Sequence, residues 1–328
     1  MTGPGASHSR TCLITGGAGF IGSHLALLLA RSEAVVRVLD DFSTGRRENL
    51  SDLTTKITMA EGDIRNRDLV RQLMDGVDVV FHLAAVAAVA PSIKDPLTCN
   101  EVNVGGTLNV LAAARDTGVR RVVIASSAAV YGPEPPVPTP ETSSCVPASP
   151  YAVSKAAGEH YARVFAKLYG VEAVSLRLFN VYGPRQNPAS EYSGVVSRFL
   201  ERLLQGEALA VDGDEEQSRE FVFVDDVVQA LTLAAEVPGI SGEVFNVATG
   251  RRTSINELAT TLAAVVAPEK QIGPVHRAAR AGDVRHSCAN IGKANRDLGY
   301  APRYSLAEGL ARTVDWWRRE CGPSGRDR

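Results

Sequence analysis

Tyr151 and Lys155 are the residues whose types and spacing most directly suggest chemistry, because they stand four positions apart in the segment SPYAVSK. On a helix, that spacing places both side chains on one face, about one turn from each other. A free tyrosine has a pKa of about 10 and is a poor base at neutral pH, but a neighbouring ammonium stabilises its phenolate. The pair could therefore remove a proton from an alcohol.

A helix whose two ends are marked in the sequence must position this pair. Ser149 can cap the first turn, Pro150 suits the first helical position, and Gly170 can end the helix. The sequence therefore predicts one helix over Pro150–Tyr169, with Tyr151 in its first turn.

Ser127 could complete the catalytic set, because it follows the apolar run Arg121–Ser126, which predicts a buried strand. Open parallel sheets bind ligands at the carboxyl ends of their strands, and a serine hydroxyl can both donate and accept a hydrogen bond. Ser126 is the alternative, since adjacent strand residues point to opposite faces of a sheet.

The order of the predicted elements indicates the fold class. Short runs that are apolar throughout alternate with amphipathic stretches, which is typical of an α/β fold with a doubly wound parallel sheet between two layers of helices. The first predicted strands are Thr11–Thr15, Val35–Leu39, Val77–Leu83 and Arg121–Ser126.

The segment TGGAGFIG follows the first predicted strand and opens the first predicted helix. Glycines there allow a tight turn and a close approach of the backbone to a pyrophosphate, while the helix N-terminus faces the anion. The expected dinucleotide contacts are Gly16, Gly19, Phe20, Ile21 and Gly22.

Acidic residues end the second predicted strand. The carboxylate of Asp40 can accept hydrogen bonds from both hydroxyls of an adenosine ribose. A 2′-phosphate would meet like charge at Asp40 and Asp41, which favours NAD over NADP, although Arg46 and Arg47 follow closely.

The regularity of the pattern changes along the chain. We expect residues 1–10 to be a disordered tail, residues 11–180 to form a Rossmann-like NAD-binding domain, and residues 181–328 to form mainly a smaller substrate-binding lobe. Strand-like runs near Val174–Phe179 and Glu243–Val247 are expected to return to the main sheet. The proline-rich loop from Gly132 to Pro150 is a candidate lid.

The composition argues for small-molecule partners. Of the 328 residues 45% are hydrophobic and the net charge is −2, so no basic field attracts nucleic acid or an anionic membrane. The apolar runs, such as Val77–Val89, are shorter than the roughly 20 residues of a membrane span. The five cysteines form no CxxC pair, which predicts neither disulfides nor a metal site and favours a cytoplasmic location.

A series of motifs resembles, in order and spacing, those of the NAD-dependent epimerase/dehydratase family, which is part of the extended short-chain dehydrogenases/reductases. They are TGGAGFIG, LDDFSTG, GDIR, HLAA, SSAAVYG, YAVSK, RLFNVYGPRQNP, EFVFVDDVV, FNVATG and GDVRHSCANIGKA. The resemblance runs from about Thr11 to Trp317 and is closest to the UDP-glucose/UDP-N-acetylglucosamine 4-epimerases. It implies NAD as cofactor, a UDP-sugar substrate, and a homodimer formed through helices at Pro96–Asp116 and Pro150–Tyr169.

The resemblance also implies roles for single residues, in catalysis, in cofactor binding and in holding the diphosphate and uridine of the substrate. They are the catalytic residues Ser127, Tyr151 and Lys155, the adenine contacts Asp63 and Ile64, the groove residues Leu83, Ala84 and Asn103, and the nucleotide-sugar contacts Asn180, Arg219, Arg280 and Asp283. A guanidinium suits phosphate oxygens, which agrees with the two arginines.

Three further positions discriminate among members of the family. Ala128 and Ala129 stand where the 4,6-dehydratases have an acidic pair, and alanine cannot exchange a proton, which argues against 4,6-dehydration. Ser287 resembles the residue beside the C2 substituent of the sugar, and its small side chain leaves room for an N-acetyl group. The run Val86–Pro91 lacks the polar or basic residues of many relatives, so the sugar could be oriented differently.

The sequence is therefore interpreted as that of a nucleotide-sugar 4-epimerase, in which Tyr151 takes the 4-hydroxyl proton, hydride passes to bound NAD, and the 4-keto sugar turns before the hydride returns. Epimerisation of UDP-glucuronate is an alternative, because Arg185 could meet a carboxylate, and epimerisation of a dTDP-sugar is another. Reduction of a ketosugar is another. A non-catalytic NAD sensor is the alternative outside the enzymes.

Overall fold

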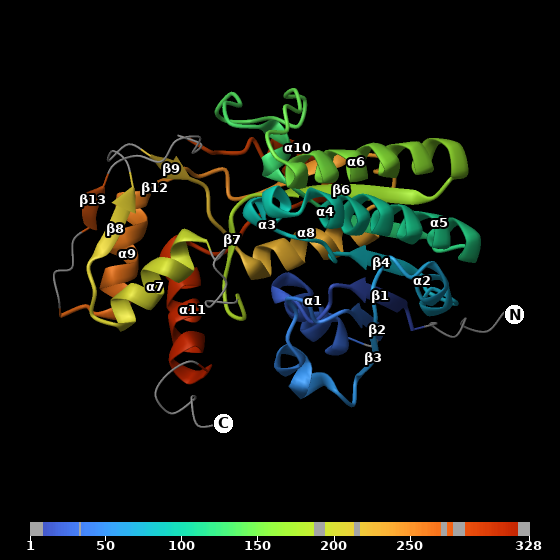
Figure 1. Ribbon diagram of the computed structural model, residues 1–328, viewed down its shortest axis with the longest axis horizontal. Coiled ribbons are helices and arrows are strands. Elements are labelled where there is room, and N and C mark those ends of the chain that lie inside the picture. The colour runs from blue at the N-terminus through green and yellow to red at the C-terminus, as the bar shows by residue number, and fades with distance from the viewer. Residues whose placement is uncertain are drawn as a thin grey trace, which may run out of the picture.

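A seven-stranded sheet forms the centre of the protein (Figure 1). The structure is a computed structural model that describes residues 9–32, 34–186, 194–212, 217–269, 274–277 and 286–320. All neighbouring strands of the sheet are parallel, in the order β11, β6, β5, β4, β1, β2, β3. Their bounds are β1 Thr11–Thr15, β2 Val35–Asp40, β3 Ile57–Glu61, β4 Val79–His82, β5 Arg121–Ser127, β6 Glu172–Leu178 and β11 Val244–Val247. The predicted doubly wound parallel sheet is confirmed, and so is the return of the two later strands β6 and β11 to it.

Helices cover both faces of the sheet, because successive side chains of each strand point to opposite sides. In β1, Cys12 and Ile14 pack into the core on one face, whereas Leu13 packs into the core on the other. The first face is covered by α1 (Phe20–Ala30), η1 (Arg47–Leu53), α8 (Val224–Glu236) and α10 (Gly292–Leu298), and the second by α2 (Arg67–Leu73), α5 (Thr107–Thr117) and α6 (Pro150–Tyr169). Both faces of the strands are therefore apolar, as their sequences indicate.

Helix α6 has the predicted bounds and caps. The Ser149 hydroxyl accepts a hydrogen bond from the Ala152 N–H at 3.2 Å, and Gly170 ends the helix with a φ of 70°. The helix expected over residues 96–116 is continuous but irregular, since α4 (Pro96–Asn100) and α5 are joined by a π-helical stretch, η2 (Glu101–Gly106). A short helix, α3 (Val89–Lys94), precedes it.

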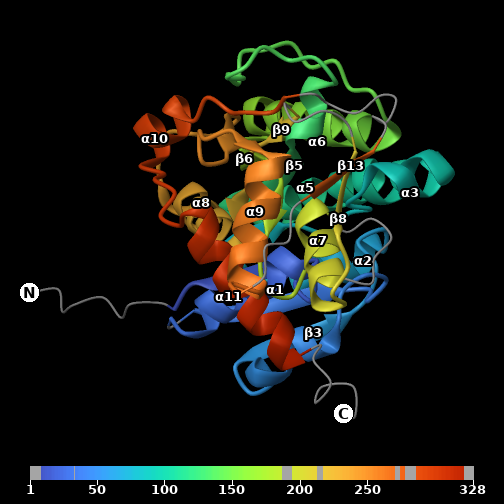
Figure 2. The ribbon, with the colours of Figure 1, turned by 90° about the vertical axis from the view of Figure 1, so that its left-hand side faces the viewer.

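A smaller lobe from the C-terminal half of the chain lies to one side of the sheet, and Figure 2 shows it from that side. It has its own apolar core, which includes Phe199, Leu258 and Leu310. Its elements are α7 (Val195–Leu204), α9 (Ile255–Val266), α11 (Leu306–Glu320), and the paired strands β8 (Leu209–Asp212) and β13 (Pro274–Arg277). The remaining elements are η3 (Ala128–Tyr131) and the strand pairs β7 (Val181–Tyr182) with β10 (Val222–Phe223) and β9 (Ser218–Arg219) with β12 (Thr253–Ser254).

The loop from Gly132 to Pro150, a candidate lid in the sequence, is joined at its centre to distant segments of the chain. Thr139 is buried at its centre and makes backbone hydrogen bonds in both directions, donating to the Cys288 carbonyl at 2.8 Å and accepting from the Asn290 N–H at 2.9 Å. The Asn246 side-chain amide also donates to the Thr139 carbonyl at 2.9 Å. These long-range bonds hold the loop against the body of the protein.

Within the described ranges, no helix is long and apolar enough to cross a bilayer. Of the tail predicted at residues 1–10, positions 1–8 lie outside the described residues.

Candidate active site

A cavity of about 1090 Å³ lies between the carboxyl ends of the strands and the smaller lobe. Most of the residues predicted for the site line it. They are Gly16, Gly19, Phe20, Ile21, Gly22, Asp40, Asp41, Asp63, Ile64, Leu83, Ala84, Ser127, Tyr151, Lys155, Asn180, Arg219 and Ser287. Arg280 and Asp283, also predicted, lie outside the described residues.

Asn103 is the predicted groove residue that does not line the cavity. It is buried behind the wall, where its side-chain oxygen accepts from the Val86 N–H at 2.8 Å and its side-chain nitrogen donates to the Val86 carbonyl at 3.1 Å and to the Ser154 hydroxyl at 2.9 Å. Asn103 therefore fixes the loop after β4 to helix α6.

The turn between β1 and α1 leaves no room for a side chain at Gly16, or at Gly22 in the α1 helix that follows it. Gly16 has a φ of 71°, and a Cβ there would lie 2.7 Å from the Ala84 nitrogen. A Cβ at Gly22 would collide with the backbone of Gly16. Gly19 caps α1 without a side-chain hydrogen bond, so the first N–H groups of that helix can meet an anion.

Asp40 lies at the end of β2 with its carboxylate buried. One oxygen accepts from the Ala18 N–H at 2.8 Å and the other from the Phe42 N–H at 2.9 Å. Burial raises the pKa of Asp40, and these hydrogen bonds oppose the rise. Arg47 is engaged elsewhere, since its guanidinium stacks on Phe42 and pairs with Glu61, so it does not neutralise Asp40. The carboxylate is fixed beside the turn that would hold a pyrophosphate, as a ribose contact requires.

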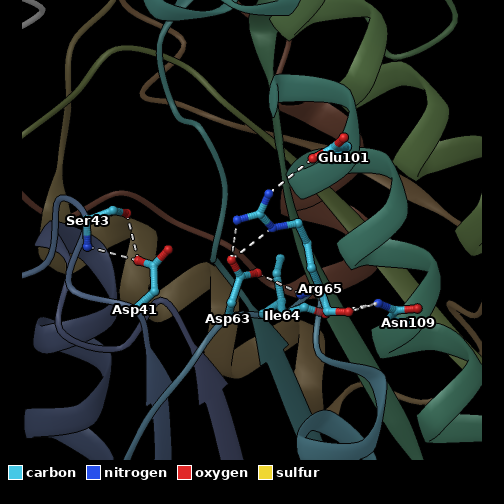
Figure 3. A network of polar contacts seen from close by, with 7 residues as sticks. All are labelled: Asp41, Ser43, Asp63, Ile64, Arg65, Glu101 and Asn109. Carbon is cyan, nitrogen blue, oxygen red and sulfur yellow. Dashed lines mark hydrogen bonds and ion pairs between the residues drawn. The ribbon is translucent and has the colours of Figure 1, made fainter. Parts of the chain in front are cut away.

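A polar network forms the edge of the cavity around the GDIR segment (Figure 3). Arg65 donates two hydrogen bonds to one oxygen of Asp63, at 2.8 and 2.6 Å, and a third to Glu101 of η2 at 3.1 Å. The side-chain amide of Asn109 donates to the carbonyls of Ile64 and Arg65, both at 3.1 Å. The hydrogen bonds from Arg65 lower the pKa of Asp63, which keeps this carboxylate ionised at the edge of the cavity.

Replacing Arg65 by alanine should weaken NAD binding modestly. The side chain of Arg65 is 45% exposed, and exposed ion pairs contribute about 0.2–1 kcal/mol, so we expect the Kd for NAD to rise by a factor of about 1.4 to 5. Isothermal titration with NAD would measure it, with Arg71→Ala on the exposed face of α2 as the control. An unchanged Kd, or an equal change in the control, would contradict the role of Arg65.

The predicted catalytic residues meet in the middle of the cavity. The N–H of Tyr151 donates to the Ser92 hydroxyl at 3.0 Å, which fixes the first turn of α6, and the phenol is hydrogen-bonded to the Ser127 side chain. The Lys155 ammonium donates to the Ala125 carbonyl at 2.8 Å and lies 5.8 Å from the centre of the Tyr151 ring. The end of β5 and the start of α6 therefore bring a hydroxyl, a phenol and an ammonium together.

The orientation of the strand distinguishes Ser127 from Ser126. The Ser126 hydroxyl donates to Glu159, which forms a buried ion pair with Arg177 at 2.7 Å. Ser126 is thus committed to a structural cluster, and Ser127 is the serine that contacts Tyr151.

The charges around Tyr151 suit proton transfer. Burial lowers the pKa of Lys155 to about 8, so this side chain is still mainly protonated at neutral pH. Burial raises the pKa of Tyr151, and the hydrogen bond to Ser127 opposes the rise. Below them, burial lowers the pKa of His82 to about 3, and this neutral imidazole is hydrogen-bonded to Thr15 and Thr107. The cation beside the phenol is therefore Lys155, which can stabilise a phenolate.

The opposite side of the cavity carries the predicted nucleotide-sugar contacts. The Asn180 amide donates to the Glu220 carbonyl at 2.7 Å, and the N–H of Ser287 donates to the Ser218 carbonyl at 3.2 Å. Arg185 also lines the cavity and donates to the Ser23 carbonyl of α1 at 3.2 Å. The sequence did not single out Glu220 or Arg65, although both lie inside quoted motifs. The donors to Glu220 and one partner of Arg65, Glu101, are distant in sequence, whereas Asp63 stands two residues before Arg65.

Two further parts of the wall are apolar. Ala128 and Ala129 line the cavity directly after Ser127, so no carboxyl group lies at these positions. The loop after β4 contributes Val86, Ala87, Ala88, Val89 and Pro91. A sugar beside these residues would meet few hydrogen-bonding groups.

The model of the NAD dependent epimerase/dehydratase family matches residues 12–248. The chain belongs to this family. It is 44% identical over 314 residues to the UDP-glucose 4-epimerase of Mycolicibacterium smegmatis, covering 94% of this chain and 98% of that protein. The solved UDP-N-acetylglucosamine 4-epimerase of Methanobrevibacter ruminantium, in complex with UDP-N-acetylmuramic acid, superposes with a TM-score of 0.90 at 35% identity, covering 95% of this chain and 99% of that one.

The family includes other reactions as well. The UDP-N-acetyl-alpha-D-glucosaminuronate decarboxylase of Bacillus cytotoxicus is 33% identical to this chain over 318 residues, which cover 94% of this chain and 98% of that protein. The protein is therefore an NAD-dependent member of a nucleotide-sugar epimerase/dehydratase family, and the expected cofactor, NAD, is confirmed. The Gly16 turn, the open N-terminus of α1 and the buried Asp40 fit a dinucleotide.

Proposed function

We propose that the protein is a nucleotide-sugar 4-epimerase that inverts the C4 hydroxyl of UDP-hexoses, namely UDP-glucose/UDP-galactose, UDP-N-acetylglucosamine/UDP-N-acetylgalactosamine, or both. The observation that carries the proposal is that Ser127, Tyr151 and Lys155 line one cavity together, directly beside Ala128 and Ala129. The set can exchange the proton of one hydroxyl, and no carboxyl group follows Ser127 to expel a second hydroxyl as water. The 4-epimerase names of the similar proteins support this reading.

In the proposed cycle, Tyr151 takes the proton of the 4-hydroxyl while Ser127 holds the same oxygen by a hydrogen bond. The Lys155 charge stabilises the phenolate. Bound NAD supplies the hydride acceptor at C4 and the hydride donor for the return step. The proposed contacts for the diphosphate and uridine are Asn180, Arg219, Arg280 and Asp283, of which the last two lie outside the described ranges. The apolar loop after β4 would leave the hexose free to turn.

Two features bear on the choice of hexose. Ser287 lines the cavity with a small side chain, which leaves space for an N-acetyl group at C2. The glucuronate alternative relies on Arg185, whose guanidinium is already hydrogen-bonded to the backbone of α1. Among the described residues of the cavity, none favours a dTDP-sugar substrate or ketosugar reduction over a neutral UDP-hexose.

The test is to incubate the protein, without added reductant, with UDP-glucose, UDP-N-acetylglucosamine, UDP-glucuronate and dTDP-glucose in separate reactions. Anion-exchange chromatography and proton NMR resolve the products. We expect a C4 epimer from one or both of the neutral UDP-hexoses and none from the other two. No conversion of any of the four, with NAD supplied, would contradict the proposal and leave ketosugar reduction or NAD sensing to be tested.

We further propose that the protein forms a homodimer through α4, α5 and α6. Leu97 and Leu168 are 76% and 66% exposed on these helices, and Ile93 and Val153 are exposed nearby. Such an apolar face favours association with a second copy. Sedimentation velocity should give twice the monomer mass, and Leu97→Glu combined with Leu168→Glu should give monomers. A monomeric parent protein would contradict the proposal.

A further inference from the structure

Glu220 is a fully buried carboxylate, 0% exposed, that stands next to the cavity without lining it. One oxygen accepts from the N–H of Thr249 at 2.7 Å, from the Thr249 hydroxyl at 3.1 Å and from the N–H of Gly250. The other oxygen accepts from the N–H of Ala289. Burial raises the pKa of Glu220, and these hydrogen bonds oppose the rise. The backbone amides and the hydroxyl therefore take the place of water around the carboxylate.

The donors belong to two segments that are distant in sequence. Thr249 and Gly250 follow β11 of the main sheet, whereas Ala289 follows Ser287 in the segment that returns from the smaller lobe. Glu220 therefore joins the end of the sheet to the segment that carries Ser287. A hydrophobic residue of similar size could fill the space but would leave three N–H groups without this acceptor, of which that of Ala289 is buried.

The backbone on either side of the carboxylate holds two more parts of the cavity wall. The carbonyl of Glu220 accepts the hydrogen bond from the Asn180 amide at 2.7 Å, and the carbonyl of Ser218 accepts from the N–H of Ser287 at 3.2 Å. Arg219, whose side chain lines the cavity, lies between these two anchor points. One short strand and one carboxylate thus fix three of the predicted substrate contacts relative to one another.

We infer that Glu220 is a positioning residue for the nucleotide-sugar half of the cavity, acting through Asn180, Arg219 and Ser287 without touching the substrate. The inference rests on the proposed function, because it takes this half of the cavity to bind the UDP moiety. The carboxylate is needed as such, since each of its oxygens faces an N–H. In Glu220→Gln one of them becomes an NH₂ group that faces a donor.

A second buried carboxylate provides a matched control. Asp226 is 1% exposed and accepts from the N–H groups of Arg303 and Tyr304, at 2.8 and 3.3 Å, but it does not line the cavity or contact the residues that do so around Ser287. Asp226→Asn disturbs a buried carboxylate in the same way and should lower only the melting temperature.

The experiment is isothermal titration of the NAD-loaded protein with UDP, together with measurement of NAD content and melting temperature. In Glu220→Gln we expect the Kd for UDP to rise about tenfold or more with unchanged NAD content, whereas Asp226→Asn keeps the Kd of the parent protein. If Glu220→Gln does not fold, Glu220→Asp replaces it. The shorter aspartate keeps the charge but moves the carboxylate oxygens away from their donors, and the same rise in the Kd for UDP with unchanged NAD content is expected.

A Kd for UDP within twofold of the parent value in the Glu220 variant, or an equal rise in both variants, would overturn the inference. Because this readout does not need turnover, it separates the two proposals. A parent protein that does not bind UDP contradicts the proposed function itself. If the parent protein and the Glu220→Gln variant bind UDP equally well, only the role of Glu220 is contradicted.

Discussion

The Tyr151→Phe variant should lose about 10²- to 10⁴-fold in kcat for epimerisation while it keeps its bound NAD. The phenolate of Tyr151, which the Lys155 cation stabilises, is the proposed acceptor of the 4-hydroxyl proton, and phenylalanine cannot take its place. The ring itself remains, and Lys155 stays hydrogen-bonded to the Ala125 carbonyl, so the cavity should keep its shape. Product formation by anion-exchange chromatography and NAD released on denaturation would measure the two effects.

Tyr161→Phe is the matched control, because this tyrosine lies on the same helix but packs against the core of the sheet. It should retain activity close to that of the parent protein. A Tyr151 variant that turns over at the parent rate would exclude Tyr151 as the proton acceptor, so another group would have to take the 4-hydroxyl proton.

The Ser287→Tyr variant should selectively lose activity on UDP-N-acetylglucosamine. The new phenol would occupy the space that the N-acetyl group needs, and overfilling a packed site costs about 1–3 kcal/mol, which corresponds to a fall in kcat/KM of roughly 5- to 150-fold. UDP-glucose, with a hydroxyl at C2, should be converted at a rate close to that of the parent protein. The measurement is kcat/KM for both sugars on the same preparations.

Ser287→Ala separates size from hydrogen bonding, and it should leave the ratio of the two activities unchanged. Because the Ser287 N–H anchors the segment to the Ser218 carbonyl, neither substitution removes that backbone contact. Equal loss of both activities in the tyrosine variant would show that Ser287 does not select the C2 substituent.

The features that the sequence determined by itself are those set by neighbours along the chain. The bounds of α6 follow from Ser149, Pro150 and Gly170, and the four-residue spacing then places Tyr151 and Lys155 on one face. The same holds for the parallel sheet, which follows from short runs that are apolar throughout, and for the glycine turn before α1. The physical reason is that caps, turns and helix faces depend on residues only a few positions apart.

The contacts that join distant segments were decided only by the tertiary structure. Adjacent strand residues point to opposite faces of a sheet, so an error of one position in the strand would exchange Ser126 and Ser127. Only the packed sheet shows that Ser126 faces Glu159 while Ser127 faces Tyr151. The resemblance places Asn103 in the cofactor groove, but its side chain is buried behind the cavity wall.

The proline-rich loop looks mobile by composition, yet Thr139 ties it to segments more than a hundred residues away. Glu220 has no local signal, since its four donors come from Thr249, Gly250 and Ala289. The sequence therefore determined the local elements and the residues whose spacing carries chemistry. The tertiary structure decided which buried polar groups hold them in place, because a buried group takes whichever partners the folded chain brings to it.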